Sequence, residues 1–444
     1  MTASNNCSLT RRQFGTHGGL IQSLKVLGIG VSLLLQSACG EAVYDQIELM
    51  PPPVVFKDGT VDPLPNISEA DYQQQTQLFY VTDRRPATPD DTPNIYANDR
   101  GFVLRAGIAD VVADPPFSGL EELRTASRSG EGREQRSLRI ARTKEFGVLP
   151  VSDTTLLPDA PRKADMEAAG RAFARAIDQK MSGSTQKDVF IYVHGYNVDF
   201  DYPVLTAKEL QHYLGYRGAF VVYAWPSTPN RFAYFKDLET ADATRRNLRE
   251  LIVFLSRQTD AENIHIIGYS AGARLAFEAV HELALKGTSG SSGSPHVGQL
   301  ILIGSELDRT YFAQALGDGL LDQVDDLTIY GSETDSALGL STFVLGRQRL
   351  GQIWPEDEFT RDVETKLLTL SNLHLIDVSD AEDSATGNGH AYFRSSPWAS
   401  SDIILSLIYD KPPQQRGLVR PEGSAIWEFP PDYPDRVVRS TGAN

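Results

Sequence analysis

The stretch IHIIGYSAG, residues 264–272, constrains the fold of this chain more than any other. Strand-favouring residues lead up to Gly268, and the ARLAFEAVHELAL run that follows has apolar residues at helical spacing. A strand that turns sharply into a helix at G-x-S-x-G presents its serine on a tight bend. Glycines suit this bend because the two backbones come too close for a β-carbon. Ser270 is therefore either a nucleophile or only a small residue in a tight turn.

Short apolar runs occur on both sides of this motif, and amphipathic patterns separate most of them. The expected strands cover 77–83, 101–107, 137–143, 188–195, 218–225, 263–268, 299–304, 326–331 and 372–378. The expected helices cover 166–178, 204–214, 238–256, 271–285 and 308–316. This alternation predicts an α/β fold with a mostly parallel central sheet and helices on both faces. The early strands lack helices between them, so we expect them to form an antiparallel start to the sheet. One domain over 76–410 accounts for the pattern.

Residues 1–38 have the pattern of an export signal. The letters TRRQF precede an apolar run that ends at Cys39, and no acidic residue occurs before Glu41. The paired arginines resemble a twin-arginine signal. The letters SAC resemble a lipobox, in which Gln36 stands where a leucine is usual. We expect an exported lipoprotein that is acylated at Cys39 and held at a membrane of the cell envelope, facing the periplasm or the cell surface. An ordinary cleaved signal and a single membrane anchor are the alternatives.

The segments that flank the expected domain are rich in proline. Residues 39–75 are expected to form a spacer, because they combine prolines and polar residues without sustained periodicity. Residues 411–444 are expected to form a tail that wraps the surface or is partly loose, with Trp427 and Phe429 as docking residues. The Gly/Ser-rich letters KGTSGSSGSP, 286–295, predict a flexible insertion.

Composition and motifs exclude several classes of function. The formal net charge is −16 and the sequence has no basic stripe, which argues against binding to nucleic acid. There is no HExxH, cysteine cluster or P-loop, so no metal or cofactor is predicted. The sequence contains only Cys7 and Cys39, so a chain that begins at Cys39 has no pair for a disulfide.

A nucleophilic serine needs a base, and histidine is the usual one. Of the eight histidines, most lie in expected helices, strands, the signal or the insertion. His390 lies in a loop after the last expected strand, where its side chain can reach over the sheet edge. His374, inside that strand, is the weaker alternative. His194 ends an earlier strand and is expected to shape the loop that follows it.

The base in turn needs a carboxylate, which holds its tautomer and stabilises the imidazolium. In the order Ser, acid, His, the acid comes from a loop after a later strand. Asp335, just past the strand at 326–331, fits this position best. The other candidates, which are otherwise ordinary loop or cap acids, are Glu306, Asp308, Glu333, Asp377 and Asp380.

An oxyanion hole requires two backbone N–H groups near the nucleophile. One comes from the residue after the serine, Ala271. The loop after the strand at 188–195 can supply the other, since Gly195 lets the backbone approach. The N–H of Tyr196 is the candidate. The alternative is a plain strand-turn with an incidental His-Gly pair.

The strings LFYVTDR, VHGYNVDF, VVYAWPS, IIGYSAG, LTIYGSETDSAL and GHAYF occur in this order over about 77–395. Together they resemble a bacterial α/β-hydrolase family of unknown function. The resemblance implies an α/β-hydrolase fold, with Ser270 as nucleophile, Asp335 as acid and His390 as base. It also implies that Trp225 and Ser227, in AWPS, line the cleft and bind substrate. Glu306 in GSELD departs from the Pro-Asp that the family tends to have, which affects a loop and not the triad.

These inferences predict a serine hydrolase that acts on a small-molecule acyl substrate. A carboxylic ester is the expected substrate, and an amidase or acyltransferase could use the same residues. The alternative from another class is a non-catalytic envelope lipoprotein that uses the scaffold for binding, because a fold does not guarantee a function.

Overall fold

The computed structural model divides the chain into two units, 1–42 and 43–444. It describes residues 43–441 except for 66, 73–74, 90, 92–94, 185, 289–294, 346 and 353–360. The expected export signal and Cys39 therefore lie outside the described residues. Most of the expected flexible insertion lies outside them as well.

The strands within residues 43–441 form one mixed sheet with the order β1-β4-β3-β2-β6-β5-β7-β8-β9-β10-β11. The first four strands pair antiparallel, and the strands from β2 onward along this order pair parallel. The bounds are β1 Gln46–Glu48, β2 Gln77–Pro86, β3 Tyr96–Asp114, β4 Ser137–Val148, β5 Asp188–Val193, β6 Ala219–Tyr223, β7 Asn263–Tyr269, β8 Val297–Ile303, β9 Val324–Gly331, β10 Leu373–Asp377 and β11 Ile426–Glu428.

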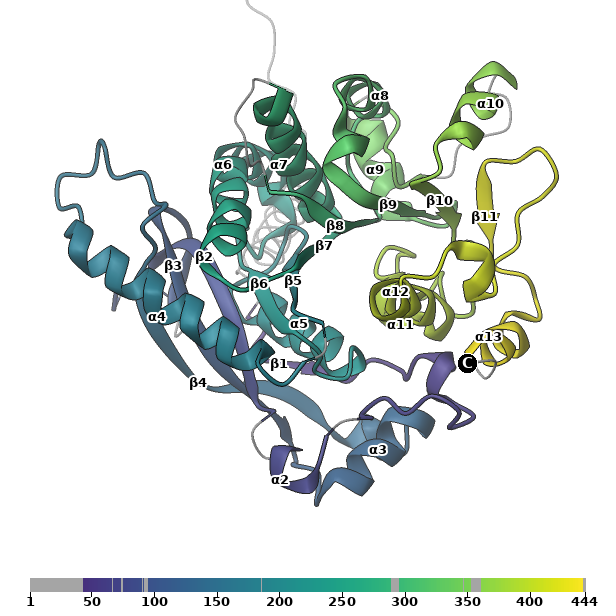
Figure 1. The fold of residues 1–444 in the computed structure, drawn as a ribbon, viewed down its shortest axis with the longest axis horizontal. Coiled ribbons are helices and arrows are strands. Elements are labelled where there is room, and N and C mark those ends of the chain that lie inside the picture. The colour runs from purple at the N-terminus through teal and green to yellow at the C-terminus, as the bar shows by residue number, and fades with distance from the viewer. Residues whose placement is uncertain are drawn as a thin grey trace, which may run out of the picture. The chain divides into compact units, whose positions relative to one another are not determined.

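Helices cover both faces of this sheet (Figure 1). One face is covered by α4, α6, α7 and α8, and the other by α5 and α12. The α-helices are α2 Glu69–Tyr72, α3 Leu120–Ser129, α4 Lys163–Met181, α5 Asp201–Tyr213, α6 Tyr234–Gln258, α7 Ala271–Thr288, α8 Arg309–Gly317, α9 Ser336–Leu345, α10 Arg361–Thr369, α11 Tyr392–Ser395, α12 Pro397–Tyr409 and α13 Tyr433–Thr441. Short 3-10 helices include η1 Val54–Phe56, η3 Arg231–Ala233 and η6 Pro413–Arg416.

The central strands are apolar throughout because both of their faces are covered. Every residue of β5, β6 and β8 is buried. Side chains that alternate along these strands belong to two separate hydrophobic clusters, one on each face. In β5, for example, Ile191 packs in one cluster and Tyr192 in the other. Burial on both faces is the reason that the sequences of these strands are continuous apolar runs.

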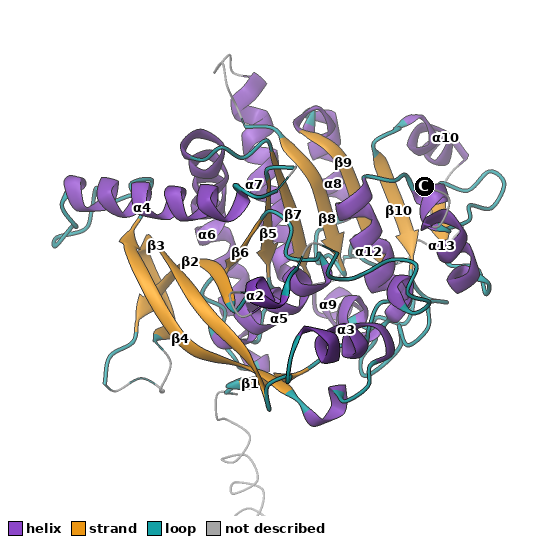
Figure 2. Ribbon diagram, turned by 60° about the horizontal axis from the view of Figure 1, so that its bottom comes forward, coloured by secondary structure: helices purple, strands orange, loops and turns teal. Residues whose placement is uncertain are grey.

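The nine expected strands correspond to β2 through β10, so the prediction of a mostly parallel sheet with an antiparallel start is confirmed. The five expected helices correspond to α4 through α8. Figure 2 shows the antiparallel ribbons β2, β3 and β4 at one side of the sheet and the parallel strands beyond them.

The N-terminal segment from residue 43 is not the spacer that the sequence predicted. Its strand β1 pairs antiparallel with β4, and the side chains of Met50, Val55 and Phe56 are buried in the cluster that also contains α5 and α12. Prolines and the absence of periodicity concealed this packing, because an extended segment can bury isolated apolar side chains without a repeating pattern.

The C-terminal segment is also part of the fold. Strand β11 extends the sheet by pairing parallel with β10. Phe429, Tyr433 and Val437 are buried, so Phe429 is a docking residue as expected, whereas Trp427 is only partly buried. The compact unit therefore extends beyond the expected boundaries of 76 and 410 at both ends.

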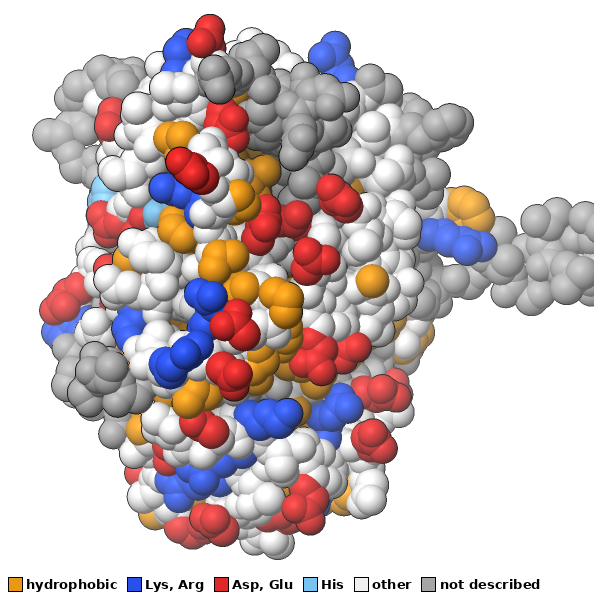
Figure 3. Space-filling model, turned by 90° about the vertical axis from the view of Figure 1, so that its right-hand side faces the viewer, with side chains coloured by type: hydrophobic (Ala, Val, Ile, Leu, Met, Phe, Trp, Pro, Cys, Tyr) orange, Lys and Arg blue, Asp and Glu red, His pale blue; other side chains and the backbone are white. Residues whose placement is uncertain are grey.

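The face formed by the C-terminal elements carries acidic and basic side chains side by side, with apolar side chains between them (Figure 3). No single sign of charge dominates this view. Among the helices of the described part, none has both the length and the apolar character needed to cross a membrane.

Candidate active site

Ser270 lies at a sharp turn between β7 and α7. Its backbone has φ +55°, in the left-handed region that non-glycine residues seldom adopt. A β-carbon on Gly268 would lie 2.6 Å from the Cα of Ala273, and one on Gly272 would overlap the carbonyl oxygen of His194. The two glycines are therefore required for the close approach of strand, helix and neighbouring loop, as the motif predicted.

The turn is fixed by its backbone, and the Ser270 hydroxyl is left free. The N–H of Ser270 donates to the carbonyl of Ile303 at 2.8 Å, which ties the turn to the end of β8. The residue is only 2% exposed, and its Oγ has no hydrogen-bond partner among the described residues. A buried hydroxyl without a partner is unusual, because such groups normally pair.

Asp335 and His390 form a buried pair. The Nδ1 of His390 lies 2.6 Å from the Oδ2 of Asp335, and the aspartate side chain is fully buried. The other oxygen, Oδ1, accepts from the N–H of Leu338 in the first turn of α9. Because Nδ1 faces a carboxylate, it carries the proton, and Nε2 is left as the basic nitrogen. This is the tautomer that a general base requires.

The imidazole of His390 is held beside the serine turn by close packing. Its ring lies 5.0 Å, centroid to centroid, from the ring of Tyr269, the residue directly before Ser270. A β-carbon on Gly304 would lie 2.9 Å from its Cε1, so only glycine fits at this position after β8. Parallel strands thus bring residues 270, 335 and 390 to one end of the sheet from three different loops.

The other described histidines are engaged elsewhere. His374, the weaker alternative, lies 3.0 Å from Asp326 through Nε2. Aspartate partners also occur for His265, His281 and His296. A His–Asp pair is therefore common in this chain, and it is the position beside the serine turn that distinguishes His390.

The loop after β5 approaches the serine turn from the other side. A β-carbon on Gly195 would lie 3.0 Å from the Cβ of Ser270, so the backbone passes directly beside the serine. The next residue is Tyr196, the expected second oxyanion donor. Ala271 is the first residue of α7, where N–H groups have no intrahelical acceptor. Both expected donors therefore belong to backbone segments that border Ser270.

His194 has the structural role that the sequence predicted. Its Nδ1 donates to the carbonyl of Gly195 at 2.6 Å, and its ring stacks on that of Trp225. Burial and the neighbouring Arg84 lower the pKa of His194 to about 3, so the ring is neutral at physiological pH.

Trp225 and Ser227 differ from expectation, because neither lines an open cleft. Both are fully buried. The indole N–H of Trp225 donates to the carbonyl of His194 at 2.6 Å, and the hydroxyl of Ser227 donates to the carbonyl of Val198 at 2.7 Å. With their polar atoms already paired, these side chains support the backbone of the loop at 194–199.

Arg84 also supports this loop, and sequence reasoning assigned it no role. Its guanidinium is fully buried and donates to the carbonyls of Val198 at 3.2 Å and Asp199 at 3.1 Å. It also donates to the Oδ1 of Asn98 at 2.8 Å. The letters VTDR were part of the resemblance, but arginine in a strand gives no sign that it will be buried.

Glu306, which the sequence offered only as an alternative acid, also lies near the His390–Asp335 pair. The residue is 4% exposed, and its Oε2 has no hydrogen-bond partner within the described part of the chain. Burial raises the pKa of this carboxyl, while the nearby His390 and Arg349 lower it. A desolvated acid this close to His390 is a feature of functional sites.

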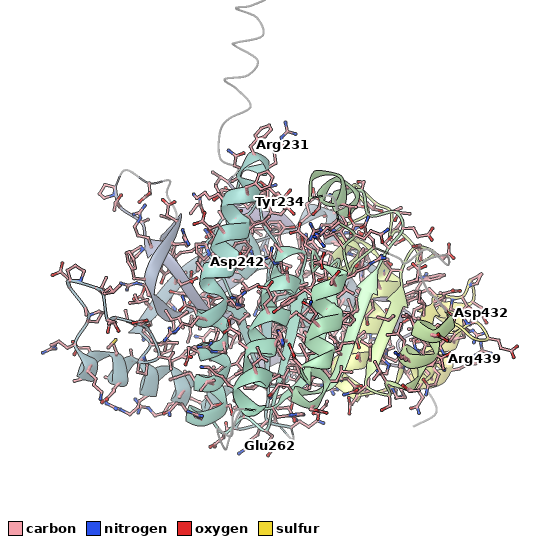
Figure 4. All side chains as sticks on the ribbon, turned by 90° about the horizontal axis from the view of Figure 1, so that it is seen from above. Arg231, Tyr234, Asp242, Glu262, Asp432 and Arg439 are labelled. Atoms are coloured by element: carbon pink, nitrogen blue, oxygen red, sulfur yellow. The ribbon has the colours of Figure 1, made fainter. Side chains whose placement is uncertain are left out.

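Aromatic side chains form one rim of the site. The ring of Tyr196 packs edge-on against that of Tyr234 at 5.3 Å, and the Tyr234 hydroxyl lies 2.8 Å from that of Ser341. Figure 4 shows Tyr234 and Arg231 at one end of the molecule and Glu262, just before β7, at the opposite end. This rim therefore lies at the carboxyl ends of the parallel strands.

Within the described ranges, no group of three or more His, Cys, Asp or Glu side chains is arranged to hold a metal ion. The chemistry available at the site comes from a free hydroxyl, an oriented imidazole and backbone N–H groups. These groups can transfer an acyl group through a covalent intermediate.

A mostly parallel sheet, helices on both faces and a serine in a strand-to-helix turn define the α/β-hydrolase fold. The family model described as "alpha/beta hydrolase of unknown function (DUF900)" matches residues 169–407. The chain belongs to this family, as the ordered strings of the sequence predicted. No curated protein matches the chain.

Proposed function

We propose that this α/β hydrolase is a serine hydrolase that cleaves a carboxylic ester. The Oγ of Ser270 attacks the acyl carbonyl carbon, and the Nε2 of His390 takes the hydroxyl proton. The N–H groups of Ala271 and Tyr196 bind the resulting oxyanion. As the C–O bond breaks, His390 returns the proton to the leaving alkoxide. Water, deprotonated by His390, then attacks the acyl-enzyme and releases the acid and free Ser270.

One observation carries this proposal: a serine hydroxyl without a partner lies in a strained turn beside a buried His–Asp pair. Left-handed backbone at a non-glycine residue costs free energy, and a buried hydroxyl without a partner adds to that cost. A purely structural serine would explain neither. Strain and an unpaired polar group at one residue favour catalysis over a passive turn.

The alternative is a binding lipoprotein without catalysis. It requires no oriented histidine, yet the pair of Asp335 and His390 is complete, buried and aligned. An amidase or an acyltransferase would use the same residues and differ only in the leaving group or the acceptor. We assign an ester rather than an amide as the substrate because the barrier to cleaving an ester is lower.

A fluorophosphonate probe tests the nucleophile. The wild-type protein should be labelled at one serine, and Ser270→Ala should abolish labelling. Ser182→Ala, at an exposed serine after α4, is the matched control and should be labelled like the wild type. Labelling that survives Ser270→Ala would refute the assignment, and an unlabelled wild-type protein would favour the binding alternative.

Ester hydrolysis tests the rest of the triad. With p-nitrophenyl esters of graded chain length, His390→Ala and Ser270→Ala should each lower kcat by a factor of about 1,000 or more. Since members of a triad act as a unit, the double variant should be no slower than either single variant. If the fold-losses in kcat of the two single variants multiplied in the double variant, Ser270 and His390 would not act as one unit.

We also propose that the protein is an exported lipoprotein acylated at Cys39. The basic start, the apolar run and the SAC letters support this proposal. The mass of the mature N-terminus should correspond to a diacyl or triacyl Cys39. An intact N-terminus, or cleavage at another residue, would contradict it.

A further inference from the structure

A cavity lies away from the candidate active site, between α3, α5 and the strands β3 and β4. Its volume is about 230 Å³. Figure 2 shows α2 and α3 beside α5 over this part of the molecule. None of its lining residues belongs to the serine turn, the loop at 194–199 or the loops that carry Asp335 and His390. The cavity therefore has no role in the proposed acyl transfer.

The walls of this cavity are mostly apolar. Strand β3 contributes Val111, α3 contributes Leu123 and Ala126, and the preceding loop contributes Phe117. On the opposite side, Tyr213 closes the wall at the end of α5. Such a lining suits the hydrocarbon part of a small ligand, provided that a few polar groups fix its orientation.

Lys208 is the polar group that distinguishes this cavity. It projects from α5 and is only 5% exposed. Its ammonium donates to the carbonyl of Gln75 and, at 2.9 Å, to the Oε1 of Gln211. Both acceptors are uncharged, and the ammonium also lies 5.0 Å from the centroid of the Tyr216 ring, a cation–π contact that brings no formal negative charge. A buried charge normally has a counter-ion, because burial without one costs several kcal/mol.

The groups around Lys208 add positive rather than negative charge. Lys180 approaches the same Gln75 with its ammonium, and together with burial it lowers the pKa of Lys208 well below its ordinary value. Asp110 acts weakly in the opposite direction. The one carboxylate in the wall, Glu209, is already occupied by the N–H of Met50 and the guanidinium of Arg394.

We propose that this cavity binds a small carboxylate with an apolar body, with the carboxylate on Lys208 and the body between α3 and β3. The bound anion supplies the counter-ion that the described residues do not provide, and the apolar wall excludes water from the pair. A volume of 230 Å³ corresponds to about eight water volumes. That size fits a straight-chain acid of roughly six to eight carbons.

Isothermal titration calorimetry with octanoate tests this site. Ser270→Ala is the background for all variants, so that no turnover can occur and the result does not depend on the proposed hydrolase activity. We expect one octanoate per chain. 1-Octanol, which has the same length and no charge, should bind at least about tenfold more weakly, because it loses the charge-assisted hydrogen bond.

Lys208→Met keeps most of the length of the side chain and removes its charge. It should weaken octanoate binding about tenfold or more and leave octanol binding unchanged. Lys187→Met, at a partly exposed lysine outside the cavity, is the matched control and should bind octanoate normally. Ala126→Phe, which fills the cavity, should abolish binding of both ligands.

Three results would overturn the proposal: no octanoate binding, octanol binding as tight as octanoate binding, or octanoate binding that survives Lys208→Met. The ratio of octanoate to octanol affinity in the Ser270→Ala protein decides the question even if the Lys208 variant does not fold. Octanoate that binds to the Ala126→Phe variant would place the site elsewhere, and that result also contradicts the proposal.

Discussion

Two residues at the candidate active site lower the stability of the folded state. Ser270 is held in left-handed backbone, which costs roughly 1–2 kcal/mol for a non-glycine residue. Glu306 has a buried carboxylate oxygen without a hydrogen-bond partner in the described structure. Strain and desolvation of this kind persist only where the surrounding packing imposes them, and they cluster at functional sites.

Glu306→Gln should stabilise the protein at neutral pH and have little effect in acid. Burial raises the pKa of this carboxyl above its ordinary value of 4.5, so the folded state holds the proton more tightly than the unfolded state. The wild type therefore loses stability as the pH rises through the raised pKa, whereas glutamine cannot ionise. Urea unfolding should show a gain of about 1 kcal/mol at pH 8 and almost none at pH 4.

Glu333→Gln makes the same chemical change at an exposed acid in the loop after β9. It should leave the free energy of unfolding unchanged at both pH values. An equal gain for Glu306→Gln at pH 4 and pH 8 would mean that its effect does not arise from ionisation.

At the scale of the element, the loop at 194–199 depends on support from two other segments. Arg84 comes from β2, and Trp225 and Ser227 follow β6. The AWPS segment is thus explained by the loop that it supports. The indole N–H of Trp225 and the hydroxyl of Ser227 donate to backbone carbonyls of this loop. A loop fixed in this way can keep an N–H in place before substrate arrives, and such preorganisation is what makes an oxyanion hole effective.

Arg84→Lys should slow the reaction more than it weakens substrate binding. Lysine keeps the charge but cannot make the several hydrogen bonds of the planar guanidinium. The loop would lose part of its support, and the Tyr196 N–H on this loop is the proposed donor to the oxyanion of the transition state. We therefore expect kcat to fall about 10- to 100-fold with KM nearly constant in the p-nitrophenyl ester assay.

Arg85→Lys, at the neighbouring and partly exposed arginine, is the control and should leave both constants unchanged. If Arg84→Lys instead raised KM and left kcat intact, Arg84 would act on substrate binding, and its assignment as a positioning residue would be wrong.

At the scale of the whole molecule, one buried ion pair ties the C-terminal segment to the domain. Arg416, in η6, donates to Asp402 of α12 at 2.8 and 3.1 Å, and both side chains are fully buried. Arg416→Met should destabilise the protein by about 3 kcal/mol or more, because it leaves a buried carboxylate without its counter-ion. Thermal unfolding followed by circular dichroism would measure the loss.

Arg436→Met breaks a pair of the same chemistry at the surface, between α13 and Asp432. Exposed pairs contribute about 0–1 kcal/mol, so the midpoint of unfolding should hardly change. Equal losses of stability in the two variants would show that the buried Arg416 pair stabilises the protein no more than an exposed pair does.

The sequence predicted the elements whose pattern is local and missed those that depend on distant contacts. β5, β6 and β8 were predictable because burial on both faces demands continuous apolar runs. β1 and β11 were missed because three residues are too short to show a period. The pairing of Asp335 with His390 followed from strand order, whereas the burial of Arg84 and Glu306 is created only by tertiary packing.

The positions of β1 and β11 also set the order in which the sheet can be completed during synthesis. They occupy its two edges, and each is contributed by a segment that flanks the parallel core. A chain leaving the ribosome has an open strand edge on β10 until residues 426–428 have emerged. Open edges pair with other chains, so a product that stops short of β11 would be prone to aggregation. The edge of β10 is thus covered only after residues 426–428 have been synthesised.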